Sequence, residues 1–179
     1  MRFRFGLTII LLAFVGYGYA CKCGGPETVK SSFEASYLVV SGQVLSKELV
    51  PFSQTIKPDS VSAIKERLKD DKQNLQFFEM SYIFKIDLAI VERYKGTDLR
   101  DTVTIYTSMH SASCGYKFEL GKSYIVYASK NSYLGFMFRD KVDLSNGSQK
   151  ENTYWTNHCT RTTEYNSIEA EELRLLSEK

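Results

Sequence analysis

The chain has 179 residues with 23 basic and 21 acidic side chains, which gives a formal charge of only +2. Arg2 and Arg4 account for that excess, so residues 21–179 are electrically balanced. A balanced chain of this length has room for one domain with a hydrophobic core, but it offers no electrostatic basis for binding nucleic acid or an anionic membrane. We therefore expect a partner that is recognised by shape and local chemistry.

Residues 1–20 have the pattern of a cleavable secretory signal. Two arginines form a positive start, an apolar run too short to span a bilayer follows, and the small residues Gly18 and Ala20 occupy the −3 and −1 positions. Cleavage after Ala20 predicts a secreted, extracellular protein that begins with Cys21. A lipoprotein signal would also place Cys21 first and would anchor it to a membrane, but residues 17–20 lack the leucine usual at −3.

The rest of the chain is predicted to be mostly strands. Helical signals occur at both ends and in an insertion of about 47–76, whose segment 59–75 carries one apolar stripe. The expected elements are a short helix over 26–36, strands over 37–45, 80–94, 101–107, 123–128 and 133–138, and an amphipathic helix over 167–177.

Two strands carry more specific expectations. Gly42 suits a bend or bulge in the first strand. In the long strand over 80–94, alternation predicts one buried face, made of Tyr82, Phe84, Ile86, Leu88 and Ile90.

Several short, twisted strands in one small domain favour a closed barrel, because closure removes exposed strand edges. The chain contains 12 Tyr and 11 Phe, enough for an aromatic core. Tyr133 and the single tryptophan, Trp155, are candidates for exposed rings that contact a partner.

The cysteines are Cys21, Cys23, Cys114 and Cys159, an even number that favours disulfides in an exported chain. Cys21 and Cys23 are too close along the chain to pair without strain. Both remaining connectivities tie the N-terminus to Cys114 and Cys159, and the spacing does not choose between them. A zinc site built from the cysteines with His110 and His158 is the competing interpretation, but neither histidine stands in a paired-ligand motif.

An ordered set of landmarks resembles the tissue inhibitors of metalloproteinases, within the wider netrin-like group. Cys21-Lys22-Cys23 directly follows the signal, and the long strand ends in Tyr94-Lys95-Gly96. The segment 111–116 is similar to the family's Ser-x-Cys-Gly segment, and Cys159 stands in a threonine-rich stretch after the strands. Together these landmarks cover nearly all of residues 21–179.

The resemblance implies a mainly β fold: a five-stranded barrel of the oligonucleotide/oligosaccharide-binding (OB) type with Greek-key connections, flanking helices and disulfides. It implies one netrin-like domain over 21–179 and the pairs Cys21–Cys114 and Cys23–Cys159. In this family the first cysteine chelates the zinc of a target protease through its α-amine and carbonyl oxygen. An α-amine titrates near about 8, so at neutral pH a share of it is uncharged and able to ligate zinc.

By this resemblance the chain is a secreted inhibitor of zinc metalloendopeptidases and a monomer. Its only metal is the zinc of the target protease, which Cys21 would bind, and it has no cofactor of its own. Lys22 would enter the pocket for the residue after the scissile bond. The protease-binding ridge would consist of Cys21, Lys22, Cys23, Gly24, His110, Ser111, Ala112 and Ser113.

The sequence also bears on two other functions, catalysis and binding without inhibition. No Ser–His–acid or Cys–His order stands out around the two histidines, so we expect no enzymatic activity. Lys22 is longer than the small residue usual at the second position of the family. The alternative is therefore a secreted netrin-like module that binds protein or glycan without inhibiting a protease, because fold does not fix function.

Overall fold

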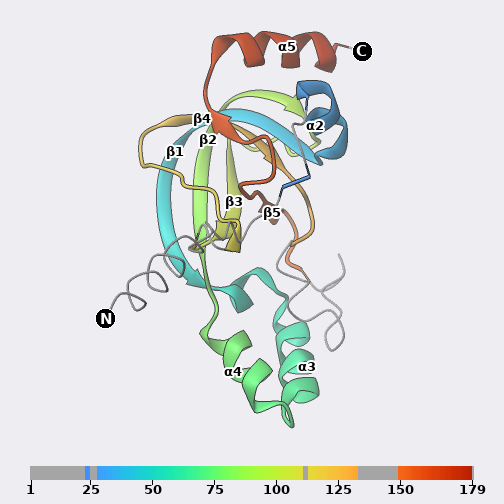
Figure 1. Ribbon diagram of the computed structural model, residues 1–179, viewed down its shortest axis with the longest axis vertical. Helices are drawn as coiled ribbons and strands as arrows, with labels where there is room; N and C mark the ends of the chain where they lie inside the picture. The colour runs from blue at the N-terminus through green and yellow to red at the C-terminus, as the bar shows by residue number, and fades with distance from the viewer. Residues whose placement is uncertain (1–22, 25–27, 111–112, 133–148, 179) are drawn as a thin grey trace, which may run out of the picture.

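The computed structural model describes residues 23–24, 28–110, 113–132 and 149–178 (Figure 1). The expected strand over 133–138 and the leader therefore lie outside the described residues. In chain order the elements are α2 (Val29–Ala35), β1 (Leu38–Pro51), the 3-10 helix η1 (Phe52–Thr55), α3 (Pro58–Leu68), α4 (Lys72–Met80), β2 (Tyr82–Lys95), β3 (Thr102–Ser108), β4 (Ser123–Ala128), β5 (Tyr154–Trp155), β6 (Thr163–Glu164) and α5 (Ser167–Ser177).

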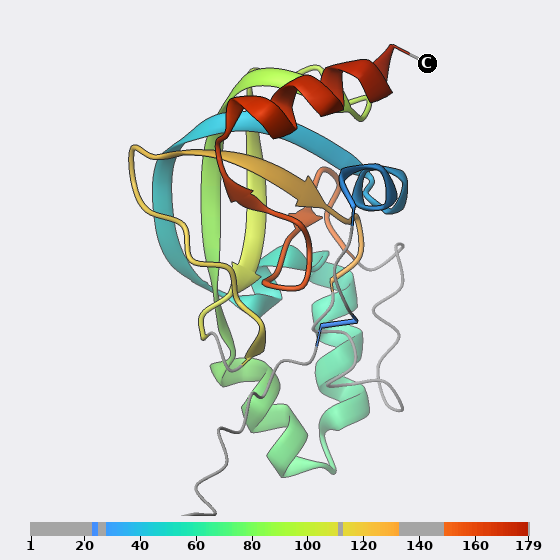
Figure 2. The same ribbon diagram turned by 45° about the horizontal axis from the view of Figure 1, so that its top comes forward.

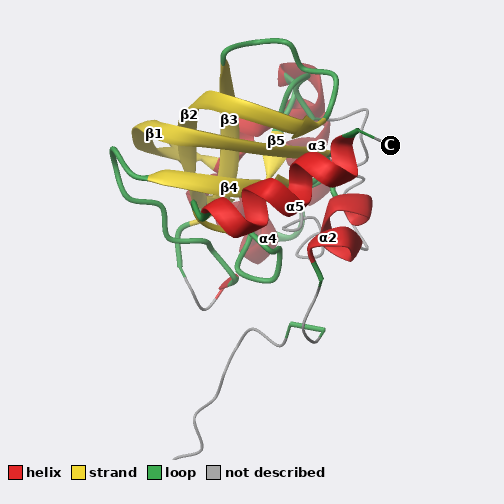
Figure 3. Cartoon of the chain, turned by 90° about the horizontal axis from the view of Figure 1, so that it is seen from above, coloured by secondary structure: helices red, strands yellow, loops and turns green. Residues whose placement is uncertain are grey.

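Six strands form one mixed sheet in the order β5-β3-β2-β1-β4-β6. All neighbours are antiparallel except β3 and β5, which run parallel. Just beyond β4, Ser129 pairs with Trp155 of β5 through two backbone hydrogen bonds of 2.8 Å. Hydrogen bonding thus leads from β1 through β2, β3 and β5 back to β4, and the strands curl around a common interior (Figure 3).

Helices cover the two ends of this sheet (Figures 1 and 2). At one end α2 and α5 pack against β1, β2 and β4 around Val39, Ile125, Tyr127 and Leu173. At the other end η1, α3 and α4 pack around Phe52, Leu68, Phe78 and Ile83. The strands themselves enclose the central cluster. Within the described part of the chain, no helix combines the length and the apolar character that crossing a membrane requires.

The bend or bulge predicted at Gly42 in β1 is confirmed. The register between β1 and β2 shifts between Ser41 and Gly42. A side chain at Gly42 would collide with the Ala89 carbonyl oxygen and the Leu88 side chain, so the residue lets the two backbones approach closely.

The predicted buried face of β2 is wrong at Tyr82, which is 46% exposed. Ile86 and Leu88 are fully buried, and Phe84 and Ile90 pack against the same central cluster. At the start of β2 the buried side reverses: Ile83 points into the cluster beneath α3 and α4. The helices of the insertion cover this end of the strand from the opposite face, and that leaves Tyr82 in solvent.

Two further expectations are corrected. The insertion contains two helices rather than one, because Asp71 caps a second helix by accepting a hydrogen bond of 3.1 Å from the Asn74 backbone N–H. Trp155 is not an exposed contact residue. It is 1% exposed, and its indole N–H donates to Gln149 Oε1 at 3.0 Å.

Leu88→Ala should destabilise the protein by about 2 to 5 kcal/mol, because it opens a cavity in a fully buried site. Leu99→Ala makes the same chemical change at a residue that is 85% exposed, so it should alter the free energy of unfolding by less than about 0.5 kcal/mol. Urea denaturation of both variants checks this. Equal effects would mean that the central cluster does not hold the sheet together.

Asp98 and Arg100 predict an acid-sensitive contribution to stability. The Arg100 guanidinium donates to both carboxylate oxygens of Asp98, Tyr154 O–H donates at 3.0 Å, and the pKa of Asp98 is held well below its usual range. A carboxyl with a lowered folded-state pKa stabilises the fold above the unfolded pKa of about 4, and this contribution is lost as pH falls further.

Asp98→Asn should therefore lower stability at pH 7 by about 1 kcal/mol, a modest value because Arg100 is half-exposed. It should also flatten the decline in stability below about pH 4. Denaturant unfolding between pH 2 and 7, with the exposed Asp101→Asn as control, measures both effects. An unchanged pH profile would contradict the assignment.

Candidate functional site

A disulfide holds the N-terminal end of the described chain. Cys23 is bonded to Cys159, 136 residues away, with the two Cα atoms 5.1 Å apart. This is the pairing that the resemblance implies. Gly24 follows in solvent, with open space where a side chain would project. The bridge fixes the backbone two residues after Cys21, although Cys21 and Lys22 themselves lie outside the described residues.

The partner cysteine, Cys159, is held by a network of threonines. Asn157 Oδ1 accepts from the backbone N–H groups of Cys159 and Thr160 at 2.8 and 2.9 Å. The hydroxyls of Thr160 and Thr162 are hydrogen-bonded to the hydroxyl of the buried Thr156. The Thr156 hydroxyl also donates to the Tyr127 carbonyl of β4 at 3.0 Å. The threonine-rich stretch around Cys159 therefore ties the disulfide to the sheet.

The second strip of the predicted ridge is a tight loop after β3. The His110 carbonyl accepts three hydrogen bonds: from the Ser113 N–H at 3.1 Å, the Gly115 N–H at 3.0 Å and the Ser113 hydroxyl at 2.9 Å. Ser113 Oγ also contacts Ser108 Oγ. These bonds hold both ends of the loop; Ser111 and Ala112 lie outside the described residues.

A backbone hydrogen bond joins the two halves of the site within the described residues. The His158 N–H donates to the Cys114 carbonyl at 2.7 Å, which lays the Cys159 loop against the end of the Ser108–Gly115 loop. Cys114 is disulfide-bonded and has a left-handed backbone, with φ of 62°. The implied Cys21–Cys114 pair involves a residue outside the described part and stays a prediction. The segments that carry Cys23 and Cys114 nevertheless meet at one place on the surface.

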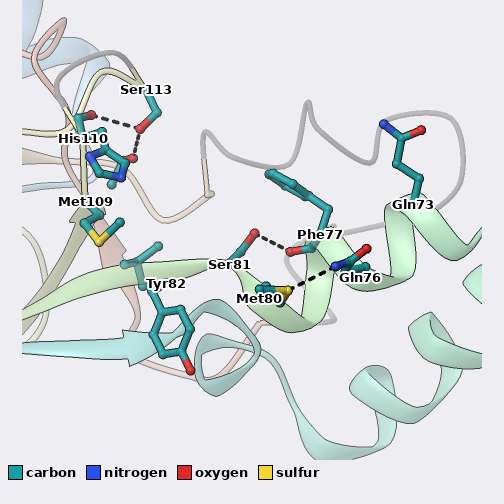
Figure 4. Close-up of a pocket in the computed structure, with 11 residues that line it drawn as sticks. Gln73, Gln76, Phe77, Met80, Ser81, Tyr82, Met109, His110 and Ser113 are labelled. Atoms are coloured by element: carbon teal, nitrogen blue, oxygen red, sulfur yellow. Dashed lines mark hydrogen bonds between the residues drawn. The ribbon is translucent and has the colours of Figure 1, made fainter.

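An apolar groove of about 520 Å³ borders this place (Figure 4). One wall is the loop with Met109, His110 and Ser113, and the other is α4 together with the start of β2. Figure 4 shows Phe77 and Met80 on α4, and Tyr82 beyond them. Phe77, Met80, Tyr82 and Met109 are all at least one-third exposed. No sequence pattern indicated the groove, although Phe77 and Met80 stand outside the predicted apolar stripe.

The histidines do not form a shared site. His110 lies in the ridge loop, and His158 is an exposed residue next to Cys159. Within the described residues no group of three or more His, Cys, Asp or Glu side chains is placed to hold a metal ion. The Cys159 loop and the Ser108–Gly115 loop, joined by the bond from His158 to Cys114, form a backbone platform at this surface.

Comparison with models of known protein families gives no match, and comparison with curated proteins gives none either.

Proposed function

We propose that this protein is a secreted inhibitor of zinc metalloendopeptidases that binds the zinc of its target through the α-amine and carbonyl oxygen of Cys21. The observation that carries the proposal is the meeting of the Cys23–Cys159 disulfide with the Cys114 loop, through the 2.7 Å bond from His158. A chain terminus that begins two residues before such an anchor can present its amine in one fixed direction.

The strand arrangement supports the same proposal. The pairing order β1-β2-β3-β5-β4, with parallel β3 and β5 and the Ser129–Trp155 link, is consistent with the OB-type Greek-key barrel of the netrin-like group. We therefore propose that residues 21–179 form one netrin-like domain with a helical insertion between β1 and β2.

The proposed mechanism blocks the protease's nucleophile. Catalytic zinc in such proteases has three protein ligands and an open position for the attacking water. The amine and carbonyl of Cys21 form a five-membered chelate ring at that position, so the water has no place. The disulfides limit the motion of the terminus before binding, which reduces the entropy lost in the complex. Lys22 extends into the neighbouring substrate pocket, and this favours proteases whose pocket is deep, wet or acidic.

A titration against purified zinc endopeptidases tests the function. Disulfide-bonded protein that starts at Cys21 should inhibit at least one of them stoichiometrically. The same protein after reduction and alkylation should be inactive, because the platform is lost. Failure to inhibit any of a broad panel at about 10 μM, where even weak complexes form, would overturn the proposal.

The apolar groove favours a second candidate function, a protein-binding module without inhibition. Its exposed Phe77, Met80 and Tyr82 are the kinds of side chain that contribute to protein interfaces. If this candidate is correct, no panel protease is inhibited, and Phe77→Ser with Met80→Ser abolishes binding to the partner while leaving the fold intact.

A further inference from the structure

A second concave site lies away from the ridge and differs from the groove in its chemistry. It is a polar pocket of about 490 Å³, lined by three lysines (Lys57, Lys130 and Lys150), two carboxylates (Asp98 and Glu151) and uncharged residues that include Asn152, Tyr37 and Tyr154. The three lysines come from distant parts of the chain: one precedes α3, one follows β4 and one precedes β5. None of them stands in a sequence motif.

These lysines stand out by their lack of carboxylate partners. Most lysines in the described part of the chain form an ion pair or donate to a backbone carbonyl: Lys30, Lys47, Lys65, Lys69, Lys85, Lys95, Lys117 and Lys122. Of the described lysines, Lys57, Lys72, Lys130 and Lys150 have neither, and all but Lys72 line the same pocket. Asp98 also lines the pocket, but its carboxylate is paired with Arg100. Three ammonium groups therefore face one carboxylate, that of Glu151, which has no ion pair within the described residues, and this leaves a local excess of positive charge.

The fold holds the three lysines in place. Ile56 and Gln149 pair as an antiparallel bridge, and the Lys150 N–H donates to the Thr55 carbonyl at 2.9 Å. The segments that carry Lys57 and Lys150 therefore run side by side, with Lys150 opposite Thr55. Lys130 Nζ lies 4.7 Å from the centre of the Tyr37 ring and 3.3 Å from its hydroxyl. Tyr37 in turn stacks on Tyr154, with ring centres 6.1 Å apart.

Two further lining residues, Glu151 and Asn152, indicate which kind of anion fits the pocket. Glu151 is exposed and makes no ion pair within the described residues, and Asn152 contributes an amide. A carboxylate repels a bare phosphate or sulfate but accepts hydrogen bonds from hydroxyl groups. A ligand that offers both negative groups and free hydroxyls would satisfy the lysines and Glu151 together. The volume lies within the range of small-molecule sites and exceeds what a single inorganic ion would fill.

We propose that this pocket binds a sulfated saccharide, with its sulfate groups on Lys57, Lys130 and Lys150 and its hydroxyls on Glu151 and Asn152. The site is separate from the protease-binding ridge and does not depend on the inhibitory function. For a secreted protein, such a site would retain the molecule on sulfated glycans outside the cell.

The test compares two triple variants of the full disulfide-bonded protein by isothermal titration with a sulfated heparin hexasaccharide. The site variant carries Lys57→Gln, Lys130→Gln and Lys150→Gln. The control variant carries Lys30→Gln, Lys72→Gln and Lys117→Gln, which remove the same charge from exposed positions elsewhere. The site variant should bind at least about tenfold more weakly than the unchanged protein, and the control within about twofold. Both variants should unfold at the denaturant concentration of the unchanged protein.

Further measurements test whether the ligand is recognised by its sulfate groups. The desulfated hexasaccharide should bind at least about tenfold more weakly than the sulfated one. Equal binding of the two saccharides, or equal losses in the two triple variants, would overturn the proposal. Inorganic sulfate, tested at constant ionic strength, should compete much more weakly than the hexasaccharide. If sulfate alone binds as tightly as the hexasaccharide, the pocket is a simple anion site and the saccharide assignment is overturned. No binding of the hexasaccharide up to about 1 mM would overturn it entirely.

Discussion

Joining one alanine to the amine of Cys21 is expected to abolish protease inhibition. The added residue converts the α-amine to an amide, whose nitrogen does not donate a lone pair to zinc, and it places a side chain where the metal would lie. The inhibition constant should rise at least about a thousandfold, equivalent to more than about 4 kcal/mol, which is the scale of a dominant interface contact. Inhibition curves for the two proteins against the same protease give this ratio.

The matched control for that experiment carries the added alanine after Lys179, at the opposite end of the chain. It should inhibit as strongly as the unchanged protein. If the N-terminal alanine has no more effect than the C-terminal one, the α-amine plays no part and the chelate mechanism is wrong.

Removing the Cys23–Cys159 disulfide should have the largest effect on stability. Cys23→Ser with Cys159→Ser releases a link across 136 residues. In the chain-entropy model a loop of this size contributes about 5 kcal/mol, and native disulfides removed from small secreted domains typically cost about 2 to 5 kcal/mol. Denaturant unfolding measures the loss, and the freed terminus should also weaken inhibition.

Reduction provides the control for the disulfide variant. Under reducing conditions the unchanged protein and the double serine variant should unfold at the same denaturant concentration, because neither retains a bridge. A difference that persists after reduction would assign the effect to packing around the cysteines rather than to the cross-link.

The elements that were predictable from the sequence are those with local signals. Helix α5 was expected over 167–177 and is found there, since Asn166 caps it and an apolar stripe faces the sheet. Strand β4 also has its expected bounds. The break between α3 and α4 was missed, although the cap at Asp71 is a local signal for it.

The errors at Tyr82 and Trp155 have a different origin. Whether each ring is buried depends on which distant segment covers it: α3 and α4 reverse the buried face at the start of β2, and Gln149 and Phe52 enclose Trp155. Alternation along a strand carries no information about such coverage. A single sequence therefore predicts that a face is apolar better than it predicts what lies over it.

The candidate site likewise depends on contacts between distant segments that local sequence signals do not reveal. The pairing of Cys23 with Cys159 was implied only by the family resemblance, because the spacing left two connectivities open. The polar pocket with the three lysines had no sequence signal at all, since Lys57, Lys130 and Lys150 are far apart in the chain. The Ile56–Gln149 bridge and the Tyr37 contact bring them to one place. Tertiary pairing, rather than any motif, creates that concentration of charge.

The most direct measurement of the central claim is the visible spectrum of a cobalt(II)-substituted target protease. The d–d bands of cobalt report the ligands and geometry of the metal site. One equivalent of the protein beginning with Cys21 should shift these bands, and the protein with an added N-terminal alanine should leave them unchanged. Inhibition of the cobalt protease with no change in its spectrum would contradict the account, because the inhibitor would then act without touching the metal.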